Sequence, residues 1–206
     1  MLGVVFASEE EASPFLSHYK RGRFEGLREG EVLQDDTLLV SITGTGKIKA
    51  TLRTERLLRA HTLTRLLHVG SCSALTDAFA LGSVVAAEQV LEGDRIELAA
   101  PAYPRMPLAV PFEGLQTGTL VTQDHTWRDK DEPTYWQRIA QLADMTGYAV
   151  SYVTATHGIP CYIVKAVAGF VMESDTSIRK NKAKAHEALA RFLVDQAVEH
   201  LAGLKA

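Results

Sequence analysis

The sequence has little cysteine, only a small excess of negative charge and no long hydrophobic run. Cys72 and Cys161 are its only cysteines, far apart and without the spacing of metal ligands. A reduced, cytoplasmic setting is the simplest interpretation. The 22 basic and 25 acidic residues leave a net charge of −3. That charge provides no electrostatic footprint for nucleic acid or for an anionic membrane, so we expect neither as a partner.

The apolar stretches are short. Runs such as 78–81 and 84–87 fall far below the roughly 20 residues of a membrane span. The N-terminus has no basic region, and its apolar stretch is too short for a signal peptide. Apolar residues make up 46% of the chain, which argues against disorder and allows a core without a metal or disulfide. No repeat or linker divides the chain, so we expect one domain over residues 1–206.

Strand-like and helix-like segments alternate along the chain. Apolar, β-rich runs predict strands over 2–7, 37–42, 63–69, 83–91, 117–122 and 161–168. Amphipathic spacing predicts helices over 47–61 and 183–204. Ser8 precedes an acidic run that reaches Glu11 three residues later, the pattern of a helix N-terminus. The alternation indicates an α/β protein with a largely parallel central sheet.

Other segments have the composition of loops. Residues 20–31 are polar and glycine-rich, 99–114 contain four prolines, and 129–133 are charged. Residues 135–158 are ambiguous, because their periodicity fits one helix whereas the alternation of elements does not.

Glycine-containing breaks follow three of the expected strands, at 44–47, 70–73 and 168–170. Ligands bind at the carboxyl ends of parallel strands, so three such breaks predict a small-molecule site. The first break is not a known phosphate loop, because Ser41 and Ile48 stand where that pattern needs Gly and Ser or Thr. It is either a tight turn, or a helix start whose backbone amides after Gly46 face a polar ligand.

Five short motifs lie in order along the chain. They are Gly3-Val-Val-Phe-Ala-Ser-Glu-Glu-Glu11, Thr43-Gly-Thr-Gly-Lys-Ile48, His68-Val-Gly-Ser-Cys-Ser-Ala-Leu75, Gly82-Ser-Val-Val85 and Asp144-Met-Thr146. Together they resemble the nucleoside phosphorylase and nucleosidase superfamily, most closely its methylthioadenosine/S-adenosylhomocysteine nucleosidase branch, over about residues 2–201. The resemblance implies a three-layer α/β/α sandwich with a mixed central sheet and a nucleoside bound across strand ends. It also implies a strand over 139–145 and a helix over 147–157.

The resemblance implies roles for several residues. Glu11 matches the carboxylate that activates the attacking water in the nucleosidases, and Ser71 matches a serine near the ribose and the nucleophile. Met145 matches the methionine that packs on the sugar, and Thr126 and Trp127 fall where the family frames the base. Without the resemblance, the glutamate and the serine fit a helix N-terminus, and the methionine and the tryptophan fit a core.

Four positions depart from the family's pattern. Thr146 replaces the glutamate that clamps the ribose, and a hydroxyl cannot accept two ribose hydroxyls as a carboxylate does. Gly169 replaces the aspartate that protonates the purine N7, a general acid that typically contributes 10²–10⁴-fold. Lys165 replaces the nucleoside-binding arginine with a point charge. His68 stands where phosphorylases keep a phosphate-binding arginine, which argues against phosphate capture.

Two functions stay open. The first is a nucleosidase in nucleoside metabolism and purine salvage, which hydrolyses an N-glycosidic bond and in which Glu173 or Asp175 replaces the missing acid. These two residues also fit a solvated loop. The second is a catalytically impaired nucleoside-binding or regulatory homologue. An active phosphorylase is the least favoured.

We expect Glu11 and Ser71 as catalytic residues, close together in a cleft. The expected substrate-binding residues are Ser8, Gly46, His68, Thr126, Trp127, Met145, Thr146, Lys165 and Gly169. We expect no metal and no cofactor.

The resemblance also implies a homodimer, because related enzymes complete each pocket with a neighbouring chain. Tyr103, Met106 and Phe112 give the 99–114 excursion the apolar and aromatic content of a buried patch. A surface loop packed on its own chain has the same composition.

Overall fold

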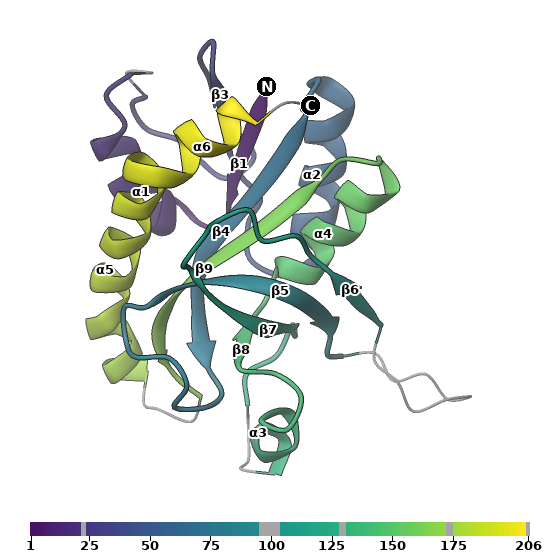
Figure 1. Ribbon diagram of the computed structural model, residues 1–206, viewed down its shortest axis with the longest axis vertical. Helices are drawn as coiled ribbons and strands as arrows, with labels where there is room; N and C mark the ends of the chain where they lie inside the picture. Colours follow the sequence, from purple (N-terminus) through teal and green to yellow (C-terminus); the bar gives the residue numbers. More distant parts are fainter. Residues whose placement is uncertain (22–23, 95–103, 128–130, 172–174, 205–206) are drawn as a thin grey trace.

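A twisted central sheet lies between two layers of helices in the computed structural model (Figure 1). The structure describes residues 1–21, 24–94, 104–127, 131–171 and 175–204. The strands are β1 (Leu2–Phe6), β2 (Val32–Gln34), β3 (Leu38–Ile42), β4 (Arg65–Ala74), β5 (Val84–Glu92), β6 (Arg105–Pro107), β7 (Gln116–Thr122), β8 (Leu142–Asp144) and β9 (Cys161–Phe170). The helices are α1 (Glu9–His18), α2 (Lys47–Ala60), α3 (Asp131–Trp136), α4 (Gly147–Thr156), α5 (Asp175–Phe192) and α6 (Val198–Gly203), with a π-helical turn over Leu193–Ala197.

The sheet is mixed, as the resemblance implies. Its strands follow the order β2-β3-β1-β4-β8-β7-β5-β6, and β9 pairs with both β4 and β5. Strand β1 is parallel to β3 and β4, and β4 is parallel to β9. The pairs β4–β8 and β5–β9 are antiparallel. The carboxyl ends of β1, β4 and β9 therefore lie along one edge, where a ligand can reach all three.

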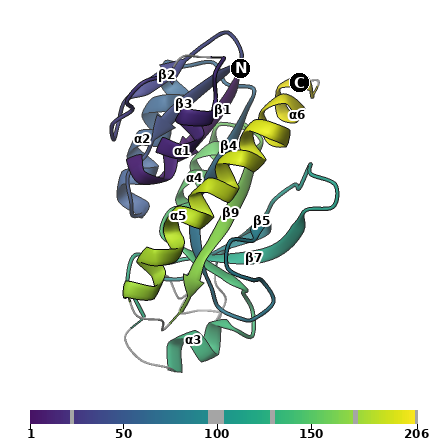
Figure 2. The same cartoon turned by 90° about the vertical axis from the view of Figure 1, so that its left-hand side faces the viewer.

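Alternate residues of the central strands pack against the two helical layers. In β1, Val4 and Phe6 pack in a cluster that also contains residues of α1, α5 and α6. Val5 points to the opposite face and packs with residues of α2 and α4. Figure 2 shows α5 and α6 running along one face of the sheet. The three-layer sandwich thus follows from strands that are apolar on both faces.

The start of α1 has the predicted cap. The Ser8 hydroxyl accepts a hydrogen bond from the Glu11 backbone amide at 3.3 Å. Only Ala7 and Ser8 separate β1 from α1. This short connection places Glu11 on the first helical turn, directly beyond the carboxyl end of β1.

Two of the three predicted strand breaks are wrong. Strand β4 continues through Gly70 to Ala74, and β9 continues through Gly169 to Phe170, because the two strands pair with each other along this stretch. The glycine at 70 has a different reason. A Cβ added there would lie 2.8 Å from the Glu11 carboxylate, so Gly70 permits a close approach between strand and acid.

Other boundaries also need correction. The charged segment 129–133 is not all loop, because α3 begins at Asp131, and 128–130 lie outside the described residues. The proline-rich excursion contains β6, while Tyr103 lies outside the described residues. The final helix begins at Asp175, before the predicted start at 183. Strand β8 followed by α4 agrees with the resemblance, although the strand is shorter than predicted. In the part of the chain that the structure describes, no helix has the length and apolarity needed to span a bilayer.

Candidate functional site

Glu11 lies at the carboxyl ends of β1 and β4 with its carboxylate held by three donors. Its Oε1 accepts hydrogen bonds from the Ser71 backbone amide at 2.8 Å and from the Ser71 hydroxyl at 2.7 Å. Its Oε2 accepts a bond from the Ala7 amide at 3.1 Å. Glu11 is 8% exposed and lines a cavity. The expected proximity of Glu11 and Ser71 in a cleft is therefore confirmed.

The cavity at Glu11 has a volume of about 360 Å³ and is called here the Glu11 cavity. Its wall is formed by Ala7, Ser8, Glu10, Glu11, Thr45, Ser71, Cys72, Ser73, Ala143, Asp144, Met145, Thr146, Lys165, Ala168, Ile178, Lys182 and His186. This size falls within the usual range of small-molecule pockets.

A second cavity of about 220 Å³, called here the Trp127 cavity, adjoins the first. The two share Ser73, Ala143, Asp144, Met145 and Ile178 in their walls. The Trp127 cavity adds Gln123, His125, Thr126, Trp127, Phe170 and Val171. Together they form one site, with a carboxylate at one end and an aromatic wall at the other.

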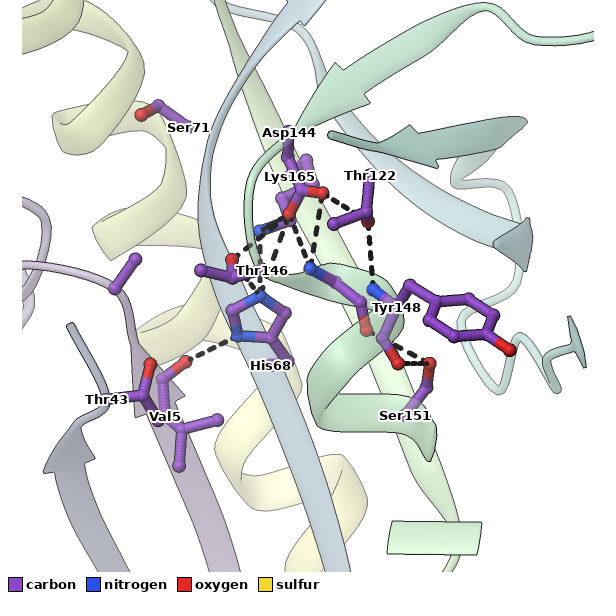
Figure 3. A network of polar contacts seen from close by, with 12 residues as sticks. Val5, Thr43, His68, Ser71, Thr122, Asp144, Thr146, Tyr148, Ser151 and Lys165 are labelled. Carbon is purple, nitrogen blue, oxygen red and sulfur yellow. Dashed lines mark hydrogen bonds and ion pairs between the residues drawn. The ribbon is translucent and has the colours of Figure 1, made fainter. Parts of the chain in front are cut away.

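A buried ion pair forms part of the wall of the Glu11 cavity (Figure 3). The Lys165 ammonium lies 2.8 Å from Oδ2 of Asp144, and both side chains are almost fully buried. Asp144 also accepts bonds from the Thr122 hydroxyl at 2.7 Å and from the Gly147 amide at 2.9 Å. Burial alone would raise the pKa of Asp144, but the charge of Lys165, with its hydrogen bond, and the contact with His68 hold the pKa well below its usual range.

His68 completes this buried network. Its Nδ1 lies 3.2 Å from the Val5 carbonyl, which can only accept, so Nδ1 carries the proton. Its Nε2 is then an acceptor and lies 2.9 Å from both the Lys165 ammonium and the Thr146 hydroxyl (Figure 3). Burial and the Lys165 charge lower the pKa of His68, which keeps the ring neutral. His68 has no exposed surface and is absent from the cavity wall, so it supports Lys165 and Thr146 from behind.

The structure brings most of the predicted site residues to the two cavities. Ser8 lines the Glu11 cavity, Met145 lines both, and Thr126 and Trp127 line the Trp127 cavity. Thr146 lines the wall but is 2% exposed, and its hydroxyl lies within hydrogen-bonding distance of both His68 and Asp144.

Gly46 and Gly169 are not on the described cavity walls, although their neighbours Thr45 and Ala168 are. The backbone amide of Lys47, after Gly46, donates to Asp124 at 2.8 Å. Because a side chain of the same protein occupies this amide, the tight-turn interpretation fits better than an open anion site. Glu173 lies outside the described residues, and Asp175 begins α5.

Sequence reasoning missed several residues on the walls. Lys182 and His186 lie one helical turn apart on α5 and line the Glu11 cavity. Burial lowers the pKa of His186, and the nearby Glu11 and Glu10 charges oppose that shift. Gln123 directly follows β7 and lines the Trp127 cavity. The spacing of Lys182 and His186 places both on one helix face, but nothing local shows which element that face meets.

Two features of the described residues bear on the other expectations. Phe112 of the proline-rich excursion packs edge-on against Phe192 of the same chain, with ring centroids 5.2 Å apart. This contact supports the self-packed loop for that residue, and the homodimer stays a prediction. Within the described ranges, no group of three or more His, Cys, Asp or Glu side chains could hold a metal ion.

A family model, described as the phosphorylase superfamily, matches residues 1–199. The chain belongs to this superfamily. A search of curated proteins gives no match.

Among solved structures, the phosphorylase-superfamily chain is similar to the Helicobacter pylori 5′-methylthioadenosine/S-adenosylhomocysteine nucleosidase in complex with a pyrrolidinol ligand. The identity is 18%, the TM-score is 0.83, and 96% of this chain and 97% of that chain are covered. Native futalosine hydrolase of the same species is 19% identical, with a TM-score of 0.80 and coverage of 95% of this chain and 97% of that chain. The Streptococcus pneumoniae nucleosidase with a transition-state inhibitor is 17% identical, with a TM-score of 0.80 and coverage of 97% of this chain and 99% of that chain. At these identities the likeness establishes the fold.

Proposed function

We propose that this protein hydrolyses the N-glycosidic bond of a nucleoside, with Glu11 activating the water. The observation that carries the proposal is the unfilled acceptor capacity of Glu11 in a cavity. A carboxylate has about four acceptor positions. Ser71 takes two at Oε1, and Ala7 takes one at Oε2. The remaining position on Oε2 suits a water molecule in the Glu11 cavity.

The two cavities match the two parts of a nucleoside. The Trp127 cavity offers an aromatic wall for the base, and the Glu11 cavity offers polar groups for the sugar. Met145 belongs to both walls, so the bond between sugar and base would lie beside it. This division supports Thr126 and Trp127 as base contacts, and Ser8 and Met145 as sugar contacts.

The reaction then follows the chemistry of general base catalysis. The water oxygen bonds to C1′ while the C1′–N bond breaks, and the electron pair of that bond goes to the base. Glu11 takes one proton from the water and later returns it to solvent. The base must leave with a proton from elsewhere or as an anion, unless it is already positively charged.

Proton supply to the leaving base is the weak point of this site. Among the described wall residues, Asp144 is the carboxyl that both cavities share, and Lys165 holds it ionised, so it cannot donate a proton. His125 also lines the Trp127 cavity, but both of its ring nitrogens already bond to Asp94 and Glu132. Gly169 has no side chain. We therefore propose that ordinary purine ribonucleosides are poor substrates, and that a nucleoside with a base needing no proton is a better one.

Release of free base from guanosine and from 7-methylguanosine tests this function. The base of 7-methylguanosine leaves as a neutral molecule without protonation. We expect base release from 7-methylguanosine to be faster by about 10²–10⁴-fold, the usual contribution of a general acid. Glu11→Gln should abolish release from both. Glu9→Gln, an exposed change in the same helical turn, should leave it unchanged.

The alternative is a nucleoside-binding homologue without catalysis. The occupied hydroxyl of Thr146 and the bare Gly169 favour it, because the positions that match the family's clamp and acid are not free to act. Binding of both nucleosides without release of base would support this alternative. A strict requirement for phosphate would instead indicate a phosphorylase.

A further inference from the structure

Three buried side-chain polar atoms have no hydrogen-bond partner in the part of the chain that the structure describes. They are Oγ1 of Thr54, Oε1 of Gln123 and Nε2 of His186. Buried polar atoms in folded proteins are nearly always paired, so an unpaired one calls for an explanation. Gln123 is 3% exposed and is one of the residues that line the Trp127 cavity. A ligand in that cavity would supply the missing donor.

The neighbours of Gln123 determine which end of its amide is unpaired. Its Nε2 donates to Oε1 of Glu132 at 2.9 Å. The opposite orientation would place the amide oxygen against that carboxylate, so the acceptor end must be the free one. His125 bonds to the same Glu132 oxygen at 2.8 Å through Nε2, and to Asp94 at 2.8 Å through Nδ1. These ion pairs hold Glu132 in place and thereby hold the amide.

Backbone contacts also fix the position of Gln123. The Gln123 backbone N–H donates to the Asp144 backbone carbonyl at 2.9 Å, which ties the end of β7 to β8. A Cβ added to Gly93 would collide with the Gln123 side chain, so this side chain lies directly against the Gly93 backbone. Gly93 itself donates to the Thr122 carbonyl at 2.9 Å. These contacts hold the Gln123 side chain in a rigid environment, as selective recognition of a ligand requires.

We propose that Gln123 recognises the base. Its Oε1 accepts a hydrogen bond from an N–H on the edge of a base held beside Trp127. This inference rests on the proposed function in that the Trp127 cavity takes the base. It selects nucleosides whose base carries an N–H donor on that edge, such as the amino group of adenine or N1–H of a 6-oxopurine. A base with only acceptors there leaves Oε1 unpaired and binds more weakly.

Binding of 9-methylpurines tests this without depending on catalysis, because these compounds have no sugar and no bond to hydrolyse. The probes are 9-methyladenine, 9-methylhypoxanthine and 6-methoxy-9-methylpurine, and the readout is calorimetric affinity. We expect the wild type to prefer the two donor-bearing purines by about three- to tenfold, the effect of one neutral hydrogen bond. Gln123→Met should remove this preference by weakening only those two. Gln137→Met, which removes an amide that bonds to the Leu75 carbonyl and lies on neither cavity wall, should preserve it.

Glu132→Gln provides a second variant, because an amide at 132 no longer prevents the Gln123 amide from turning over. It should reduce the preference even if Gln123→Met does not fold. Equal weakening of all three purines in Gln123→Met, no preference in the wild type, or no saturation at the solubility limit would each overturn the inference. A preference for the donor-bearing purines without hydrolysis of any nucleoside would refute the proposed function alone. Hydrolysis without that preference would refute base recognition by Gln123 alone.

Discussion

Lys165→Met should destabilise the protein strongly, because it leaves the Asp144 carboxylate buried without its counter-ion. The Lys165 ammonium lies 2.8 Å from Asp144 and 2.9 Å from His68, and the two charged side chains are 1% and 3% exposed. Removing one partner of a buried pair costs about 3–5 kcal/mol. We expect the lower end of that range, because the Thr122 hydroxyl and the Gly147 amide still donate to Asp144.

Thermal unfolding measures this effect directly. A domain of this size loses roughly 2–4 °C of Tm per kcal/mol, so a loss of about 3 kcal/mol should lower Tm by about 6–12 °C. Lys165→Met with Asp144→Asn should be more stable than Lys165→Met alone, because no buried charge remains. Arg59→Met, which breaks the exposed ion pair with Glu55, should leave Tm nearly unchanged.

The pH dependence gives an independent check on Asp144. In the wild type its pKa is lowered, so its stabilisation is present above the unfolded-state pKa of about 3.9 and is lost only as pH falls through the folded-state value. Without Lys165, burial should raise the pKa of Asp144, and acidification should then neutralise the unpaired charge. The stability gap between wild type and Lys165→Met should narrow from pH 7 toward about pH 4. A gap that stays constant with pH, or one below about 1 kcal/mol at pH 7, would refute the reasoning.

Three further predictions concern the site and its supports. Ser71→Ala should slow base release by about ten- to a hundredfold, because the carboxylate loses one of its two Ser71 donors; an unchanged turnover in a steady-state assay would contradict this. Glu11→Gln should abolish base release while 9-methyladenine still binds in calorimetry, since Glu11 does not line the Trp127 cavity. Burial alone would lower the pKa of His125, but Glu132 and Asp94 raise it. Protonated His125 therefore stabilises the folded state. This contribution is complete below the unfolded-state pKa of about 6.5 and is lost as pH rises through the higher folded-state pKa. His125→Gln should therefore destabilise more near pH 6 than near pH 9 in denaturant titrations, and an equal loss at both would exclude the charged ring.

Local sequence patterns determined the parts of this protein that depend on neighbouring residues. The apolar run of β1, the Ser8 cap and the position of Glu11 were all predictable, because a strand period and an N-cap involve residues only a few positions apart. The five motifs extended this to the superfamily and the three-layer sandwich, which the family match and the solved structures confirm.

Tertiary structure decided what distant residues do to one another. Gly70 and Gly169 have the composition of strand breaks, but β4 and β9 continue through them because each supplies the other's backbone hydrogen bonds. His68 has the sequence position of an anion contact, yet burial in the fold and the charge of Lys165, 97 positions away, lower its pKa and keep the ring neutral. The free oxygen of Gln123 exists because Glu132 occupies the other end of its amide, and only the folded chain brings that carboxylate within reach.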